Sequence, residues 1–426
     1  MTLQVQQLDY DRGQREFLEK SFRHRMPALI EFSLHNETVL KVIRHLRRHA
    51  TGSPATAYQY VYGIWRYHLW INNEPDRVLR DCWDSTGDPL PKMLTKHAQL
   101  VDDFAGSLQD QGEAPGTVAN NVKGVRALYR VNGLQLLLPR YPRTVRYPDR
   151  SPTPEELERV LAVADAREKV IVTLPALAGF REGTLCKLQY RHVKQDLEAA
   201  NTPVLVRVES EITKGHYADY WTFLGQEAIE YLNAYLVERR QTGETITDES
   251  PLIRDGRIET VHYGRNNDAV YPVTPGAIWK TVHSLYVKAG LIPRTKRARR
   301  YDLRVHSLRY YFRTQLTALG VNPEYAEFMM GHKGALYNDI KMKGPEFLRN
   351  IYRAAGLCIR QKTKASRLDM IKELVRGFGM DPEKVLVKDA ISEAHRGVMD
   401  PVEEQAQGLW RVLKAKVLSE LKGEKP

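Results

Sequence analysis

The two side chains best placed to act on an anion in this sequence are His306 and Arg309. They stand three residues apart at the start of the stretch HSLRYYFRTQLTALG, so both would project from one face of a helix. Backbone N–H groups at a helix start already favour negative charge, and a guanidinium beside them adds a fixed pair of donors. The pair therefore predicts a phosphate site. The helix itself is indicated by apolar residues at helical spacing and a terminal glycine: Leu308, Phe312, Leu316, Leu319 and Gly320.

Three further cationic or titratable side chains accompany this pair. Arg181 lies in GFREGTL, where a glycine interrupts a helical pattern. His332 follows Gly331 at the end of a short helical stretch, and a tight turn there would bring it back towards the preceding helix. Lys214 lies near the tip of an expected β-hairpin, because alternating valines precede a Lys-Gly turn and aromatic residues follow it.

Taken in chain order, the motifs around Arg181, Lys214, His306 with Arg309, and His332 resemble those of the tyrosine recombinases, or phage-type integrases. The family pattern is Gly-Leu-Arg, a lysine-bearing β-turn, His-x-x-Arg, Gly-His and then a tyrosine. The resemblance covers residues 153–356 and, more loosely, the helical region before them. It implies a site-specific DNA recombinase that performs strand exchange of the integrase or excisionase type through a covalent 3′-phosphotyrosyl intermediate. The catalytic residues it identifies are Arg181, Lys214, His306, Arg309 and His332.

The chemistry of that reaction suits these residue types. A tyrosine that attacks a DNA phosphodiester must lose a proton with a pKa of about 10, and negative charge gathers on the phosphoryl oxygens in the transition state. Two arginines can clamp those oxygens, a histidine can share a proton near neutral pH, and a lysine can protonate the departing 5′ oxygen. We therefore expect no metal and no other cofactor, and the sequence offers no HExxH motif.

Two tyrosines compete for the role of nucleophile. Tyr337 follows His332 by five residues and lies in GALYNDIKMKG, a polar segment bounded by glycines from which a mobile hydroxyl could be presented to DNA. Tyr352 follows His332 by twenty residues and shares one helix face with apolar residues, so it is readily explained as a core residue. We expect Tyr337 to be the nucleophile and keep Tyr352 as the alternative.

Two positions depart from the family pattern. The acidic residue that usually stands three residues after the first arginine is replaced by Thr184, and Glu182 could substitute only partly. The lysine has a competitor, because Lys187 is an alternative to Lys214. Two other interpretations stay open: a catalytically inactive DNA-binding protein of the same fold, and a strand-passing enzyme of the type IB topoisomerase kind.

The composition fits a protein with a polyanionic partner. The 426 residues carry a formal net charge of +12, which favours double-stranded DNA through release of its counterions. The three cysteines match neither a metal motif nor a disulfide framework, and the sequence shows no apolar signal segment and no run of about 18 apolar residues. We expect a cytoplasmic protein that acts on DNA.

The chain is long enough for more than one hydrophobic core. The predicted fold is mainly α with a small antiparallel β-sheet, and the resemblance implies a catalytic domain preceded by a helical core-binding (SAM-like) domain. A capping box formed by Thr153 and Glu156 marks the start of the catalytic domain. We expect five regions in this order: an N-terminal arm (1–33), a helical DNA-binding domain (34–138), a basic linker (139–152), the catalytic domain (153–357) and a C-terminal helical extension (358–426).

Basic side chains in three places are candidates for contact with DNA phosphates. They lie on a helix of the DNA-binding domain, in the linker and in a loop before His306: Arg44, Arg47, Arg48, Arg143, Arg146, Lys296, Arg297, Arg299 and Arg300. By resemblance, the protein would assemble on specific attachment-type sites as a homo-oligomer, with a tetramer joining two duplexes. The extension carries an apolar stripe that predicts a helix docked on the body or on another copy: Leu409, Val412, Leu413, Val417 and Leu421.

Overall fold

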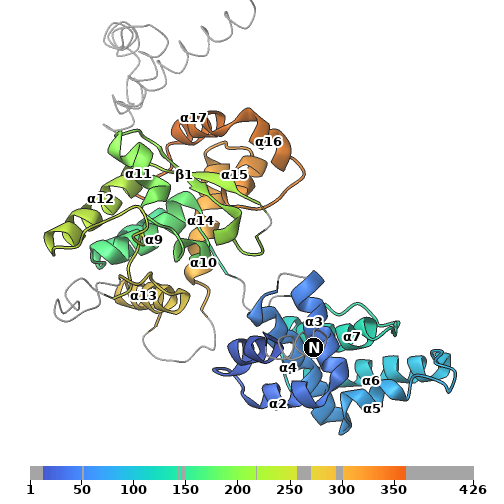
Figure 1. Ribbon diagram of the computed structural model, residues 1–426. Coiled ribbons are helices and arrows are strands. Elements are labelled where there is room, and N and C mark those ends of the chain that lie inside the picture. Colours follow the sequence, from blue (N-terminus) through green and yellow to red (C-terminus); the bar gives the residue numbers. More distant parts are fainter. Residues whose placement is uncertain are drawn as a thin grey trace, which may run out of the picture. The chain divides into compact units, whose positions relative to one another are not determined.

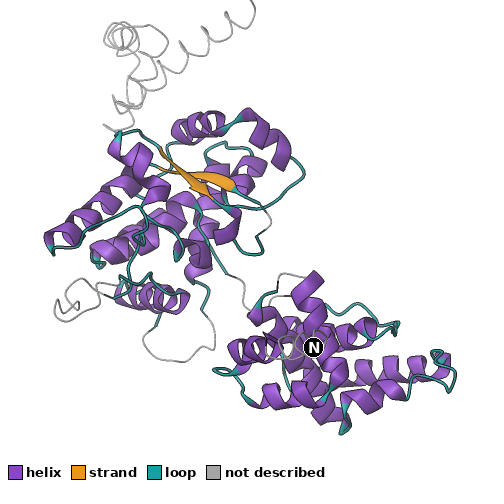
Figure 2. Cartoon of the chain, in the orientation of Figure 1, coloured by secondary structure: helices purple, strands orange, loops and turns teal. Residues whose placement is uncertain are grey.

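The computed structural model describes residues 13–49, 52–142, 144, 149–216, 218–256, 270–293 and 301–360 (Figure 1). Helices make up most of this part of the chain, and its sheet consists of two antiparallel strands (Figure 2). The predicted fold class is therefore confirmed. The larger of two compact units contains the described residues up to Pro152 and those from Ala164 to Leu357. The smaller unit contains Thr153–Val163 and the described residues from Cys358 on.

The N-terminal part of the larger unit is a helical bundle with a core of its own. Two of its helices pack backbone to backbone at Gly63 and Gly124, which have no Cβ atom. A Cβ atom at Gly63 would lie 2.6 Å from the Asn121 carbonyl oxygen, and one at Gly124 would collide with the Tyr60 carbonyl oxygen. The two helices are α4 and α7. The bundle comprises α2 (Ala28–His35), α3 (Glu37–His49), α4 (Pro54–Ile71), α5 (Pro75–Arg80), α6 (Pro91–Asp110) and α7 (Pro115–Val131).

Part of the segment predicted to be an N-terminal arm belongs to this bundle. Residues 13–22 are helical, and the side chains of Leu18, Phe22 and Leu29 are fully buried in the bundle core. The apolar residues of the segment thus gain their stability from packing on the helices that follow. Residues 1–12 lie outside the described residues.

The remainder of the larger unit surrounds one buried helix, α9 (Ala166–Ala178). Every residue of α9 from Val170 to Ala178 is buried, because other elements contact the helix on several sides. Figure 1 shows α9 among its neighbours. The other helices are α10 (Glu182–Leu185), α11 (Arg191–Glu198), α12 (Gln226–Gln241), α13 (Pro275–Lys288), α14 (Val305–Ala318), α15 (Pro323–Met329), α16 (Tyr337–Lys343) and α17 (Pro345–Ala355).

The predicted β-hairpin is present. Strands β1 (Val204–Val208) and β2 (Tyr220–Leu224) pair antiparallel, with Val204 opposite Leu224. The alternating valines of β1 are buried, as the period-two pattern predicts. A short 3₁₀ helix, Ser210–Ile212, and an exposed turn that contains Lys214 connect the strands.

The described helix of the smaller unit, α8 (Pro154–Ala162), begins at the predicted capping box. The Thr153 side chain accepts a hydrogen bond of 3.2 Å from the Glu156 backbone N–H, and the Thr153 N–H donates to the Glu156 carboxylate at 2.9 Å. The local sequence therefore sets the start of this helix.

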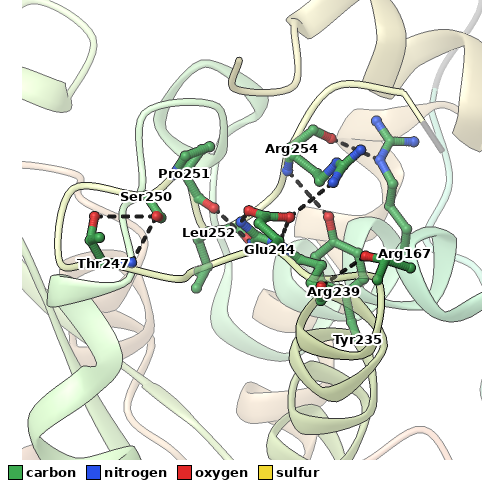
Figure 3. Close-up of polar contacts among 10 residues, drawn as sticks. Arg167, Tyr235, Arg239, Glu244, Thr247, Ser250, Pro251, Leu252 and Arg254 are labelled. Atoms are coloured by element: carbon green, nitrogen blue, oxygen red, sulfur yellow. Dashed lines mark hydrogen bonds and ion pairs between the residues drawn. The ribbon is translucent and has the colours of Figure 1, made fainter. Parts of the chain in front are cut away.

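A buried ion triad fixes the loop after α12 (Figure 3). The Glu244 carboxylate accepts hydrogen bonds from Arg239 Nε at 3.0 Å and from Arg254 Nη1 at 2.9 Å, and all three side chains are almost fully buried. Arg239 Nη1 also donates to the Pro251 carbonyl at 2.9 Å. The Arg254 carbonyl accepts from Arg167 Nε at 2.8 Å, which ties the loop to α9.

Replacing Glu244 with alanine should lower the free energy of unfolding by about 3–5 kcal/mol, because two buried guanidinium groups would lose their counter-charge. The matched control is Glu238→Ala, which removes an exposed carboxylate from the same stretch of chain. Urea unfolding of the full-length variants measures the difference. Equal losses in the two variants would show that the triad contributes nothing.

The stabilisation by Glu244 should also depend on pH. Burial opposes the charged form, but the hydrogen bonds and charges of Arg239 and Arg254 outweigh it and hold the pKa of Glu244 below its usual value. A carboxylate with a depressed folded-state pKa stabilises the fold above its unfolded-state pKa and loses this effect as the pH falls through the folded-state pKa. The stability gap between wild type and Glu244→Ala should therefore narrow in acid, as unfolding curves at several pH values would show.

Candidate active site

Two arginines that lie 128 residues apart in the sequence meet at one backbone oxygen. Arg309, on the first turn of α14, donates from Nη2 to the Met330 carbonyl at 3.2 Å, and Arg181 donates from Nη1 to the same carbonyl at 3.5 Å. Arg309 Nη1 also donates to the carbonyl of Gly179. Helix α9 ends at Gly179 in the left-handed conformation, with φ of 69°, and this turn leads directly into Arg181.

The Arg309 guanidinium is a buried cation held by dipoles. Its residue is 2% exposed, and among the described residues neither it nor Arg181 forms an ion pair. Burial, followed by the positive charge of Arg181, lowers the pKa of Arg309 to about 10, so the group stays charged at neutral pH. Two neighbouring cations without a carboxylate partner in this part of the chain provide a place for an anion such as a phosphate.

His332 reaches this pair through the turn that the sequence predicts after α15. Gly331 has a φ of 72°, its N–H donates to the Phe328 carbonyl at 2.8 Å, and the His332 N–H donates to the Glu327 carbonyl at 2.9 Å. These two bonds form a Schellman motif, which reverses the chain at the helix end. As a result, His332 Nε2 lies 3.5 Å from Arg309 Nη2.

His306 lies at the start of α14, within the field of the same cations. Its ring packs edge-on against Tyr310, with the ring centroids 4.9 Å apart. The residue is exposed, yet partial burial of the ring, followed by the charges of Arg309 and Arg181, lowers its pKa. His306 is therefore neutral at pH 7, and one ring nitrogen is free of a proton.

Lys214 makes no hydrogen bond with this group in the described part of the chain. It lies in the exposed turn between β1 and β2, and within the described part of the chain it forms no hydrogen bond or ion pair. The strand that follows the turn does contact the site, because the ring of Tyr220 on β2 packs against Gly331. The competing residue, Lys187, is exposed after α10.

The two candidate nucleophiles differ less in burial than their sequence contexts predict. Tyr352 is a core residue, 1% exposed, whose hydroxyl donates to the Leu177 carbonyl at 2.7 Å. Tyr337 begins α16 and is 8% exposed, with its hydroxyl donated to the Asp219 carbonyl. The expectation of a free hydroxyl on Tyr337 is therefore not met in this structure. Its ring also packs on Phe328 of α15, at a centroid distance of 5.3 Å.

The surroundings of Tyr337 are cationic. The ammonium groups of Lys333 and Lys341 lie 6.0 and 5.8 Å from the ring centroid, and Lys341 forms an ion pair of 2.8 Å with the Asp219 carboxylate. Burial and the charge of Asp219 raise the pKa of Tyr337, while Lys341 opposes them. The hydroxyl is thus protonated at neutral pH and needs a proton acceptor before it can attack.

The carboxylate of the candidate site belongs to Glu327, which none of the sequence motifs indicated. Thr184, at the family's acidic position, is buried, and Glu182 is exposed. Glu327 on α15 contacts His332 Nδ1 instead. The signal was present in the sequence, since a helix that ends in Gly-His through a Schellman motif brings the histidine next to the residue five positions before it.

The predicted DNA-binding residues are only partly within the described chain. On α3, Arg44 forms an ion pair of 2.8 Å with Glu37, and Arg47 stacks on the ring of Phe17 at 4.9 Å, whereas Arg48 is exposed. The other candidates lie outside the described residues: Arg143, Arg146, Lys296, Arg297, Arg299 and Arg300. The apolar stripe of the C-terminal extension does so as well. In the described chain, no helix combines the length and apolar character needed to span a membrane.

Comparisons with known proteins point to one family. The model described as "Phage integrase family" matches residues 151–335. The tyrosine recombinase XerD of Staphylococcus aureus is 24% identical over 243 residues, which cover 55% of this chain and 74% of that protein. The tyrosine recombinase XerA of Thermococcus kodakarensis is 25% identical over 299 residues, which cover 68% of this chain and 85% of that protein.

Solved structures of the same kind are similar at lower identity. A XerH site-specific recombinase bound to a palindromic difH substrate has a TM-score of 0.48 and 13% identity, with 83% of this chain and 93% of that chain covered. A lambda integrase dimer bound to a core site has a TM-score of 0.44 and 13% identity, with 74% and 94% covered.

Replacing Gly331 with alanine should destabilise the protein by more than the roughly 1–2 kcal/mol that a left-handed alanine costs. The added Cβ atom would lie 2.5 Å from the Tyr220 ring. The matched control is Gly290→Ala, which follows α13 with a similar φ of 70° but has no atom within 4 Å of the added Cβ. Urea unfolding compares them, and an equal loss in both would contradict close packing around the His332 turn.

Proposed function

Because this chain belongs to the phage integrase family of tyrosine recombinases, we propose that it is a site-specific DNA recombinase that cleaves and rejoins DNA strands. The observation that supports this function best is the convergence of Arg181 and Arg309 on the Met330 carbonyl, with His332 against Arg309. These residues come from three separate motifs of the sequence and form one cationic group. The reaction requires such a group, because a phosphoryl-transfer transition state concentrates negative charge on its oxygens.

The scissile phosphate would bind beside the two guanidinium groups. Arg309 is fixed by the Gly179 and Met330 carbonyls, so it does not need to reorganise as charge develops on the phosphate. Arg181 is only partly buried and can turn a second pair of donors to the same oxygens. His306, neutral at pH 7, can either donate to a phosphoryl oxygen or accept a proton.

Tyr337 is our choice of nucleophile. Its ring contacts Phe328 on the helix that precedes His332, and the ammonium group of Lys341 opposes the rise in the tyrosine pKa that burial and Asp219 cause. Attack on phosphorus requires the hydroxyl to leave the Asp219 carbonyl. Tyr352 serves as a core residue, since its hydroxyl is buried against α9.

Lys214 would supply the proton to the departing 5′ oxygen. Its position on an exposed turn allows the ammonium to approach a bound DNA strand, and lysine is well suited to donating a proton to an alkoxide. The chemistry assigned to these side chains needs no metal. Recombination joins two duplexes, so we also propose that four copies assemble on specific sites, where the net charge of +12 aids DNA binding.

Wild-type protein should form a covalent adduct with nicked duplexes tiled across the DNA that flanks its gene, and the adduct should survive denaturation. Tyr337→Phe should abolish it, because the attacking oxygen is absent. Tyr352→Phe is the matched control: it loses one hydrogen bond in the core, about 1 kcal/mol, and should keep forming adduct. The adduct is measured by denaturing electrophoresis. The reverse result would make Tyr352 the nucleophile, and no adduct with wild type would contradict the proposed function.

Arg181→Lys should slow adduct formation by about 10²–10³, since a lysine keeps the charge but loses the fork that stabilises the transition state. Stability should change little, because the side chain makes a single long hydrogen bond. The control variant, Lys280→Gln, removes an exposed positive charge from α13 and should keep the wild-type rate. Single-turnover kinetics compares the rates, and equal rates for all three proteins would exclude Arg181 from the reaction.

A further inference from the structure

Glu327 makes two contacts with His332 and one with Arg313. Its carboxylate contacts His332 Nδ1 through one oxygen and Arg313 Nε through the other. Its backbone carbonyl accepts the His332 N–H at 2.9 Å. The side chain is 25% exposed, so it is partly shielded from water.

The protonation state of this pair follows from its partners. Burial opposes ionisation of Glu327, but the hydrogen bond and charge of His332 and the charge of Arg313 outweigh it, so the pKa of Glu327 is below its usual value. An ionised carboxylate can only accept hydrogen bonds. When the imidazole is neutral, its hydrogen therefore sits on Nδ1, and Nε2 is the nitrogen that faces Arg309 at 3.5 Å.

From this geometry, and resting on the function proposed above, we propose that Glu327 and His332 form a carboxylate–histidine dyad in which Nε2 accepts the proton of the attacking tyrosine. The bond from the tyrosine oxygen to phosphorus forms as the bond from phosphorus to the 5′ oxygen breaks. The tyrosine proton moves to His332 Nε2, and the 5′ oxygen takes a proton from a separate acid, for which Lys214 is our candidate. Glu327 is a positioning residue that fixes the ring and stabilises the imidazolium.

The dyad accounts for the missing acidic residue of the family pattern. Thr184 cannot carry a negative charge, and Glu182 is exposed. Within the described chain, Glu327 is the carboxylate that contacts the cationic group. The second partner, Arg313, holds the other carboxylate oxygen, so the plane of the carboxylate is fixed.

Several other charged or titratable groups surround His332 and would influence the same proton. Arg309 and His306 face it from α14, and Arg181 lies on the shared Met330 carbonyl. Tyr220 packs on the preceding glycine, and Lys333 is the next residue. None of these groups is anionic at neutral pH, whereas Glu327 is. Removal of the Glu327 charge should therefore have a distinct effect on the pH dependence of the reaction rate.

The first test measures adduct formation by the full-length protein as a function of pH, on the flanking-DNA fragment that gives the most adduct. Glu327→Gln should lower the plateau of the rate–pH curve about tenfold or more and move the acid limb of that curve to lower pH. The reason is that the imidazolium of His332 loses its counter-charge, while the ring keeps a hydrogen-bond acceptor. Glu324→Gln removes the same charge one turn earlier on α15 and should leave both unchanged. A lower rate with an unmoved acid limb would reduce Glu327 to a structural residue and overturn the dyad.

The second test does not depend on activity. Nitrogen NMR of protein labelled at its 13 histidines, with His332 assigned from a His332→Asn spectrum, should show His332 with its hydrogen on Nδ1. In Glu327→Met, which offers no acceptor, that form should no longer predominate. A wild-type ring with hydrogen on Nε2 alone would overturn the proposal. Failure of the recombinase function itself would appear differently, as the absence of adduct from wild type on every fragment.

Discussion

The site depends on one buried guanidinium group whose partners are carbonyl dipoles. Taking the charge of Arg309 out of water costs several kcal/mol, and a carboxylate partner would offset that cost but would also neutralise the charge. The Gly179 and Met330 carbonyls accept hydrogen bonds from its two terminal nitrogens and leave the positive charge available to an anion. The same Met330 oxygen receives Arg181, so one backbone atom sets the separation of the two cations. The rest of the fold has to place the Gly179 and Met330 carbonyl oxygens close to each other.

The ends of two helices place these carbonyl oxygens. Helix α9 ends in the left-handed Gly179, whose carbonyl then points at Arg309, and the chain continues directly into Arg181. Helix α15 ends in a Schellman motif at Gly331, which exposes the Met330 carbonyl and turns His332 back. Because both features are backbone geometries at glycines, side-chain changes elsewhere can alter the surface without moving the cationic group of Arg181, Arg309 and His332. The packing of Tyr220 on Gly331 links the hairpin to the same point.

The carboxylate beside the cationic group stands at a different position from the acidic residue of the tyrosine recombinase pattern. Thr184 stands at the usual acidic position, and Glu327 brings a carboxylate to His332 from another helix. Tyr337 is also held by a residue outside its own helix, because its hydroxyl donates to the Asp219 carbonyl, immediately before β2. The hairpin therefore contacts both the histidine turn and the candidate nucleophile.

The sequence by itself determined the features that arise within a few residues: the capping box at Thr153, the hairpin with its alternating valines, the apolar stripe of α14 and the turn at Gly331. The order of the motifs was sufficient to identify the family. Only the tertiary structure decided which carbonyls hold Arg309, that residues 13–33 contribute to a core, and that the Tyr337 hydroxyl is bonded. The reason is physical, since local patterns depend on neighbouring residues, whereas the bond from Arg309 to Gly179 joins residues 130 positions apart and exists only after α9 and α14 have packed.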